Sequence, residues 1–312
     1  MNALLDQTRP EKPETTVELV RARPLLGTMV EISATGSGAE QVLDAIERAF
    51  NAVETVHRLM SYQDPESDVS SLNRMANSCP VQVSGHTWHV LETAQKISEA
   101  SGGLFDITVA PTLTRLGFLP KHDGFPKING NGDWRHVELL PGNRVRFARK
   151  LRIDLSGIAK GYAADLAAQA LKAFGMAAGR VNAGGDMRMF GAGRQSIHVR
   201  APGAHTQSIP LVELACGAVA TSAGYYASRR HKGARVTSLV DPLTRTACKV
   251  GRSVTVLAGE CMIADALTKI VHVDPARANA TLNRFKARAL IVETDLISGG
   301  YRVFDSRQDN HD

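Results

Sequence analysis

The fold of this chain is decided by one stretch near its middle, Asp154-Leu155-Ser156-Gly157-Ile158-Ala159-Lys160-Gly161-Tyr162-Ala163-Ala164-Asp165. The residues from Ile153 to Leu155 predict a short strand, and apolar residues recur at helical spacing from Ile158 to Phe174. Small residues at the junction let an anionic ligand approach backbone N–H groups at the start of the helix. Lys160 lies in the first turn, where the helix dipole disfavours a cation, so it suits a role as an anion ligand. The alternative is an ordinary strand-to-helix turn with a solvated lysine, and the P-loop pattern is absent.

On both sides of this stretch, apolar residues follow either strand or helix spacing. Alternation from Thr28 to Ile32 predicts a strand, and apolar residues recurring after Ala39 and after Thr87 predict two helices. Strands and helices are interspersed without strict β-α-β alternation, so we expect an α+β fold with mixed or antiparallel sheets and packed helices. Further strands are expected at 137–139, 145–147, 180–182, 187–190, 196–199, 211–214, 218–221, 236–240, 253–258, 289–292 and 301–304, and a further helix at 262–271.

The size and composition of the chain indicate one globular domain. It has 312 residues, of which 43% are hydrophobic, and this is enough to bury a large core. The composition excludes bulk disorder and fibrous repeats. No internal repeat or linker divides the chain, so we expect a single domain at residues 17–305. Residues 1–16 predict a loose polar tail, and residues 306–312 a short C-terminal one.

Charge and apolar runs limit the classes of partner. The net charge of +6 suits anionic ligands such as nucleotides, but no run of five Lys or Arg occurs, which argues against nucleic-acid binding. The sequence contains no apolar run of 18 residues, so we expect no membrane span. The N-terminus lacks a basic segment followed by an apolar stretch, so we expect a cytoplasmic protein without a secretory signal. The four cysteines are widely spaced and predict neither a disulfide framework nor a zinc site.

Three further motifs place polar groups among apolar or small residues. Asp265 and Thr268 share one face of a helix, and a carboxylate with a hydroxyl is a hard-oxygen pair that suits magnesium. A partly buried Asp that caps a neighbouring element is the alternative. The paired glycines in Asn182–Asp186 allow positive φ or close backbone approach, or simply form a turn. Asp106 and Asp241 either orient a ligand or stabilise turns.

Taken together and in this order, these motifs resemble the ApbE family, the FAD:protein FMN transferases. The resemblance covers residues 20–295, and Asp154–Asp165 is its most specific part. The other matching segments are Gly27-Thr28, Met60-Ser61-Tyr62, Asp68–Asn73, Gly103–Pro111, Leu116-Gly117-Phe118, Asn182–Asp186, Ala220-Thr221-Ser222, Val240-Asp241-Pro242 and Ala264–Leu267.

The resemblance implies an activity and a set of site residues. The family cleaves FAD at its pyrophosphate, attaches FMN to a Ser or Thr hydroxyl of an acceptor protein, releases AMP and requires Mg2+. Matching positions imply that the flavin binds at Tyr62, Leu104, Phe105, Asp106 and Asp154, with Lys160 near its phosphates. They imply metal ligands at the Gly157 carbonyl, the Asp265 side chain and Thr268. The catalytic residues implied are Lys160, Asp265 and Ser238.

Two departures from the family pattern bear on this activity. Ser238 stands where the family usually has a histidine implicated in activating the acceptor hydroxyl, and a serine is no general base near neutral pH without help. Lys269 stands where the family usually has the threonine of Asp-x-x-x-Thr, and Thr268 comes one residue earlier, about 100° away around the helix. Either Thr268 still reaches the metal, or the Lys269 ammonium lies where magnesium normally does and leaves the site metal-independent or inert. Ala223 and Arg245 replace glycines.

Three functions are therefore compatible with the sequence. The first is FMN transfer from FAD to an acceptor flavoprotein of a redox complex. The second is a FAD-binding carrier or sensor without transfer, which the changes at Ser238 and Lys269 motivate. The third is a magnesium-dependent FAD pyrophosphatase, in which water replaces the acceptor hydroxyl. The sequence identifies neither the acceptor nor the oligomeric state.

Overall fold

The computed structural model describes residues 16–128, 132–200, 208–225, 228–294 and 301–306. The predicted tails fall outside these residues, apart from Thr16 and Ser306. None of the helices in the described part of the chain combines the length and apolar character that a transmembrane span requires.

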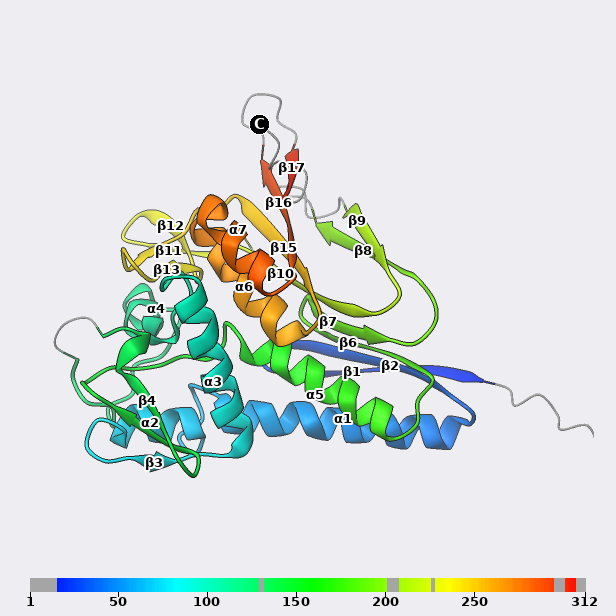
Figure 1. Ribbon diagram of the computed structural model, residues 1–312, viewed down its shortest axis with the longest axis horizontal. Helices are drawn as coiled ribbons and strands as arrows, with labels where there is room; N and C mark the ends of the chain where they lie inside the picture. The colour runs from blue at the N-terminus through cyan, green and yellow to red at the C-terminus, as the bar shows by residue number, and fades with distance from the viewer. Residues whose placement is uncertain (1–15, 129–131, 201–207, 226–227, 295–300, 307–312) are drawn as a thin grey trace, which may run out of the picture.

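One large antiparallel sheet forms the centre of the molecule (Figure 1). Every neighbouring pair of its strands is antiparallel, which confirms the expected α+β fold and excludes a doubly wound one. In spatial order the strands are β1 (Val17–Leu25), β2 (Thr28–Gly36), β6 (Ala178–Ala183), β7 (Asp186–Phe190), β10 (Gly217–Ala223), β15 (Arg252–Ala258), β16 (Arg288–Thr294) and β17 (Tyr301–Asp305).

Three helices lie side by side along this sheet: α1 (Ala39–Met60), α5 (Ala159–Ala173) and α6 (Cys261–Val273) (Figure 1). Helix α1 packs against β1 and β2, α5 against β6 and β7, and α6 against β10 and β15. Their apolar faces form the main core with the sheet. A further helix, α7 (Pro275–Arg284), packs on α6.

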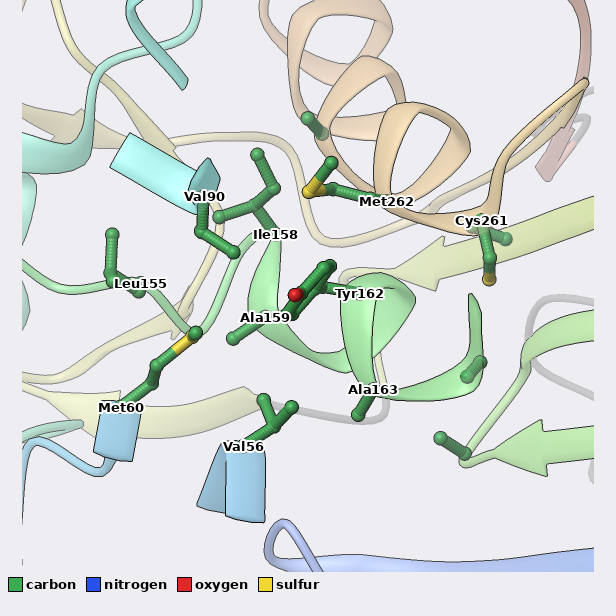
Figure 2. Packing of buried hydrophobic residues seen from close by; sticks show 14 of the residues in the cluster. Val56, Met60, Val90, Leu155, Ile158, Ala159, Tyr162, Ala163, Cys261 and Met262 are labelled. Atoms are coloured by element: carbon green, nitrogen blue, oxygen red, sulfur yellow. The ribbon is translucent and has the colours of Figure 1, made fainter. Parts of the chain in front are cut away.

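The segment Asp154–Asp165 determines how α5 packs against α6. A Cβ atom on Gly161 would lie 2.3 Å from the Cys261 carbonyl oxygen, so the two backbones touch where only glycine fits. The Asp165 carboxylate accepts hydrogen bonds from the backbone N–H groups of Cys261 (2.9 Å) and Met262 (2.8 Å) and thereby caps α6. Figure 2 shows Tyr162 and Met262 packed together at this junction.

A second group of elements lies beside the large sheet and contributes one wall of the site. It holds α2 (Asp68–Met75), α3 (Gly85–Ala100), α4 (Ala110–Leu116), the 3₁₀ helices η1 (Ile107–Val109) and η2 (Trp134–His136), and a sheet of β3 (Val81–Gln82), β5 (Arg144–Phe147) and β4 (Val137–Leu140). Short hairpins complete the chain: β8 (Gln195–Arg200) with β9 (Ser208–Leu214), β11 (Ser228–His231) with β12 (Ala234–Thr237), and β13 (Val240–Asp241) with β14 (Thr246–Ala247).

The strand predicted at Ile153–Leu155 is wrong, because this segment forms no strand and joins no sheet. Its backbone groups find other partners. The Asn73 side chain binds both the N–H (2.8 Å) and the carbonyl (3.0 Å) of Ile153, and the N–H of Asp154 donates to the Ile107 carbonyl (2.8 Å). The segment therefore links α2 and η1 to the start of α5.

Candidate active site

A cavity of about 990 Å³ lies between the large sheet, the second group of elements and the hairpins. One wall is apolar and includes Leu104, Phe105, Ile107, Leu113 and Phe118. The floor is polar, and its charged groups include the ammonium groups of Lys160 of α5 and Lys269 of α6. An apolar wall above two ammonium groups suits a ligand with a planar ring at one end and an anionic group at the other.

The structure brings most of the predicted site residues together at this cavity. Those that line it are Leu104, Phe105, Asp106, Asp154, Gly157, Lys160 and Ser238. Asp265 and Thr268 are fully buried beneath the floor and reach it through Lys269 and Ser222.

Tyr62, like Asp265 and Thr268, is not among the residues that line the cavity, and it belongs to a separate aromatic cluster. Its ring is 4% exposed and packs edge-on against His122 and Phe125. Its hydroxyl is buried without a hydrogen-bond partner among the described residues. A flavin contact by Tyr62 therefore requires movement of this aromatic cluster, and its role stays a prediction.

Lys160 lies between two buried carboxylates. Its ammonium forms an ion pair with Asp186 on β7 and lies 3.9 Å from the Asp265 carboxylate on α6. Burial alone would lower the pKa of Lys160, but the two carboxylates outweigh it and raise the pKa above its usual range. Lys160 is therefore a permanent cation at the cavity floor.

Asp186 is the strongest sign that this floor is built to hold a positive group. The side chain is 0% exposed, and its Oδ1 atom has no hydrogen-bond partner among the described residues. Burial, followed by the nearby charge of Asp265, raises its pKa. A buried carboxylate with an unused acceptor is costly, and the Lys160 ammonium is what compensates it.

Asp265 differs from Asp186 because each of its two carboxylate oxygens has a hydrogen-bond or ion-pair partner. One carboxylate oxygen forms an ion pair with Lys269, and the other accepts from the Gly161 N–H (3.1 Å). Burial would raise the pKa of Asp265, but Lys160 and Lys269 lower it, so it stays ionised.

The hydroxyl of Thr268 is also fully engaged. It donates to the Asp265 carbonyl (2.7 Å) and is hydrogen-bonded to the Ser222 hydroxyl (2.8 Å). Lys269 in turn donates to that same Asp265 carbonyl (2.9 Å) and to the Ser222 hydroxyl (3.1 Å). Among the described residues, no cluster of three His, Cys, Asp or Glu side chains offers an alternative metal site.

Asp106 and Asp154 order the apolar wall. Asp106 accepts from the backbone N–H groups of Thr108 (2.7 Å) and Trp134 (3.3 Å), and Asp154 accepts from the Ser156 N–H (3.3 Å) and hydroxyl. Burial raises the pKa of both carboxyl groups. Each therefore holds a turn and also lines the cavity, whereas the ligand-orienting role of Asp106 stays a prediction.

The paired glycines after β6 need both properties expected of them. Gly184 and Gly185 have φ values of 68° and 104°, and a Cβ atom on Gly184 would lie 2.5 Å from the Thr28 hydroxyl. The Asn182 side chain accepts from the Gly185 N–H (2.9 Å) and closes the turn. This turn brings Asp186 under Lys160.

Ser238 lies at the rim of the cavity, on the segment between β12 and β13. Within the described residues, neither a carboxylate nor an imidazole is hydrogen-bonded to its hydroxyl. His198 of β8 is the one histidine among the described residues that line the cavity, and its side chain is exposed.

From the sequence we identified the Lys269 ammonium as an alternative to the metal, but we assigned no role to Asp186 or His198. Asp186 is the last residue of the Asn182–Asp186 motif. An acidic residue that follows two glycines was the feature from which its role could have been predicted. Nothing local to β8 distinguishes His198, since only the tertiary fold carries its hairpin to the cavity.

The fold and the site together define an α+β protein whose cavity combines an apolar wall with two lysines, each paired with a buried aspartate. Comparison with known proteins gives the particular family. Residues 26–291 match the model of the ApbE family, and the chain belongs to this family. The family was therefore correctly inferred from the sequence.

The chain aligns with individual relatives over most of their length. The chain is 30% identical to a FAD:protein FMN transferase of Vibrio cholerae over 91% of this chain and 90% of that protein. It is 28% identical to a FAD:protein FMN transferase of Treponema pallidum, over 82% of this chain and 78% of that one. Among solved structures, the ApbE protein of Thermotoga maritima has a TM-score of 0.77 at 28% identity and covers 92% of this chain and 96% of its own. The flavin transferase ApbE of Vibrio cholerae has a TM-score of 0.76 at 25% identity, over 93% and 97%.

Proposed function

We propose that this chain is a FAD:protein FMN transferase. The observation that carries the proposal is the pair of lysines, Lys160 and Lys269, at the floor of a cavity with an apolar wall. The apolar wall suits the flavin ring, and the ammonium groups suit the negative charge of the pyrophosphate. The curated relatives bear this activity in their names.

The transfer is a displacement at phosphorus. The hydroxyl oxygen of an acceptor Ser or Thr attacks the phosphorus on the riboflavin side of the FAD pyrophosphate. The bond from that phosphorus to the bridging oxygen breaks, AMP leaves with this oxygen, and the hydroxyl proton passes to a base. Charge that develops on the phosphoryl oxygens is stabilised by the Lys160 ammonium, which Asp186 holds in place.

The acceptor is a flavoprotein of a redox complex in this proposal, and its hydroxyl enters past the rim at Ser238. His198 is the described lining residue best suited to take the proton, because it is the one imidazole among them and imidazole is the commonest general base in enzymes. Ser238 then positions the acceptor rather than deprotonating it.

The family resemblance implies a magnesium ion held by Gly157, Asp265 and Thr268. These residues do not fit the ion in their present arrangement, because the carboxylate of Asp265 and the hydroxyl of Thr268 are both engaged. The transfer step above is therefore derived from protein groups alone.

A FAD-binding carrier without transferase activity is the second candidate. It is favoured by one observation, the lack of a basic partner for the Ser238 hydroxyl within the described residues. A FAD pyrophosphatase would share the floor and use water as the nucleophile.

Intact-mass measurement separates the three functions. Purified protein is incubated with FAD and an acceptor domain from a redox flavoprotein, with and without magnesium, and AMP is followed by chromatography. We expect the acceptor to gain the mass of FMN minus water, with one AMP released for each acceptor modified. AMP release without acceptor would identify the pyrophosphatase. Tight FAD binding with neither product, across several acceptors, would identify the carrier.

A further inference from the structure

Lys269 lies between two of the residues expected to hold magnesium. Its Cε atom is 3.5 Å from the position a Cβ atom would take on Gly157, and its ammonium is ion-paired with the Asp265 carboxylate one helical turn earlier. The side chain lines the cavity and is 19% exposed. The lysine thus spans the gap from Gly157 to Asp265.

The contacts of this ammonium are those of a fixed charge. Besides the Asp265 carboxylate, it donates to the Asp265 carbonyl (2.9 Å) and to the Ser222 hydroxyl (3.1 Å). An ammonium has three N–H donors, and three acceptors on two elements hold it in one position. A surface lysine would instead keep its head group in water.

A magnesium ion would have to displace these contacts. Magnesium demands octahedral oxygen ligands at about 2.0–2.1 Å, so an ion on Asp265 would occupy the volume of the Lys269 ammonium. It would also need the Thr268 hydroxyl, which is fully buried and bonded to Ser222 (2.8 Å).

Charge leads to the same conclusion. The two buried carboxylates, Asp186 and Asp265, face two ammonium groups, Lys160 and Lys269. The cluster is therefore balanced without a further cation. With an uncharged residue at position 269, one negative charge would remain uncompensated, and it would favour a divalent ion.

We propose that the Lys269 ammonium is a built-in cation that takes the place of a divalent metal, so that this chain binds the FAD pyrophosphate without magnesium. Lys269 and Lys160 then flank the pyrophosphate from α6 and α5. The inference rests on the proposed function only for the choice of FAD as probe.

The test combines FAD binding with metal binding. Wild-type protein and the variants Lys269→Thr and Lys269→Met are titrated with FAD, by flavin fluorescence, in EDTA and in magnesium chloride. In EDTA we expect wild-type protein to bind FAD as tightly as in magnesium. Lys269→Met should bind about 10- to 100-fold more weakly in EDTA, which is the loss of one charge-assisted contact. Lys269→Thr, which restores a threonine one turn after Asp265, should recover FAD binding only when magnesium is added.

Calorimetric titration with magnesium chloride alone provides a readout independent of FAD. We expect no binding heat from wild-type protein and a saturable heat from Lys269→Thr, with thermal melting as the check that each variant is folded. Magnesium binding by the wild type, or FAD binding by the wild type that EDTA weakens tenfold or more, would overturn the inference. If FAD fails to bind in both buffers, the proposed function fails, while the magnesium titration of the wild type still decides the role of Lys269.

Discussion

The floor and the rim of the cavity are built in opposite ways. On the floor, Lys160, Lys269, Asp186 and Asp265 are mutually paired, and both carboxylates are fully buried. At the rim, Ser238 has no basic partner within the described residues, and its loop is hydrogen-bonded to the neighbouring elements through Arg245 and Arg115. This difference indicates that binding of the ligand is specified by the core of the fold, whereas the transfer step depends on a surface loop that can change without cost to the core.

Removal of Lys160 should break the floor most severely. Lys160→Ala leaves Asp186 and Asp265 without their shared cation, and loss of one partner of a buried pair costs about 3–5 kcal/mol of stability. We also expect FAD affinity to fall. Flavin fluorescence measures the affinity, and urea unfolding measures the stability. Lys172→Ala, on the same helix but over the Phe190 ring, is the matched control and should bind FAD normally. Unchanged FAD affinity in Lys160→Ala would remove this residue from the site.

The pH dependence of stability tests whether His272, on α6 behind the cavity floor, is shielded from water. Burial, with the nearby charges of Arg252 and Lys269, lowers the pKa of His272 to about 4 from the ordinary value of 6.5. The unfolded chain therefore binds a proton at a higher pH than the folded one, so stability is full above pH 6.5 and is lost as the pH falls toward 4. The expected loss is about 3 kcal/mol, at about 1.4 kcal/mol per pH unit.

A comparison of wild-type protein with His272→Gln isolates this contribution. Asp165 acts in the opposite sense, because burial raises its pKa to about 6 and its protonation favours the folded state at low pH. Asp165 is present in both proteins, so the difference between their urea-unfolding curves from pH 7 to pH 4 reports His272 alone. Glutamine preserves a donor toward the Ser222 carbonyl, which the histidine reaches at 2.8 Å. Parallel curves would show that His272 is not buried as a neutral ring.

A histidine at the rim should sharpen the contrast between binding and transfer. Ser238→His supplies a general base beside the acceptor hydroxyl, a contribution typically worth about 10²- to 10⁴-fold in rate. We expect faster FMN transfer with FAD affinity unchanged, measured by the intact mass of the acceptor over time. The paired variant His198→Gln should slow transfer in the wild-type background. If His198→Gln leaves the rate unaltered, the proton leaves by another route.

The smallest expected effect concerns the anchor of the rim loop. Arg245 adopts a left-handed conformation with φ of 57°, and its guanidinium donates to the carbonyls of Thr108 (3.1 Å) and Gly132 (2.6 Å). Arg245→Gly removes these bonds without adding backbone strain, and should cost about 1–2 kcal/mol. Hydrogen exchange of residues 238–247 should accelerate, whereas exchange in α5 should not. Equal acceleration in both segments would mean that floor and rim are one cooperative unit.

The sequence predicts the helices and the fold class of this molecule better than it predicts the side-chain pairs at the cavity floor. Helices α1, α3, α5 and α6 follow from apolar spacing, and the antiparallel α+β fold follows from the order of elements. The cavity-lining positions at 104–106, 154 and 160 follow from family motifs. The pairing of Lys160 with Asp186 and the contact of Gly161 with Asp265 join residues 26 and 104 positions apart, so local pattern does not reveal them. The Ile153–Leu155 segment has strand composition, but Asn73 takes the hydrogen bonds that a neighbouring strand would need.

A crystal structure of the wild-type protein with FAD, grown in EDTA, tests the central claim most directly. In this structure we expect the pyrophosphate to lie within hydrogen-bond distance of the Lys160 ammonium, and the flavin ring to lie against the wall of Leu104 and Phe105. A flavin bound outside this cavity, or a pyrophosphate remote from Lys160, would contradict it.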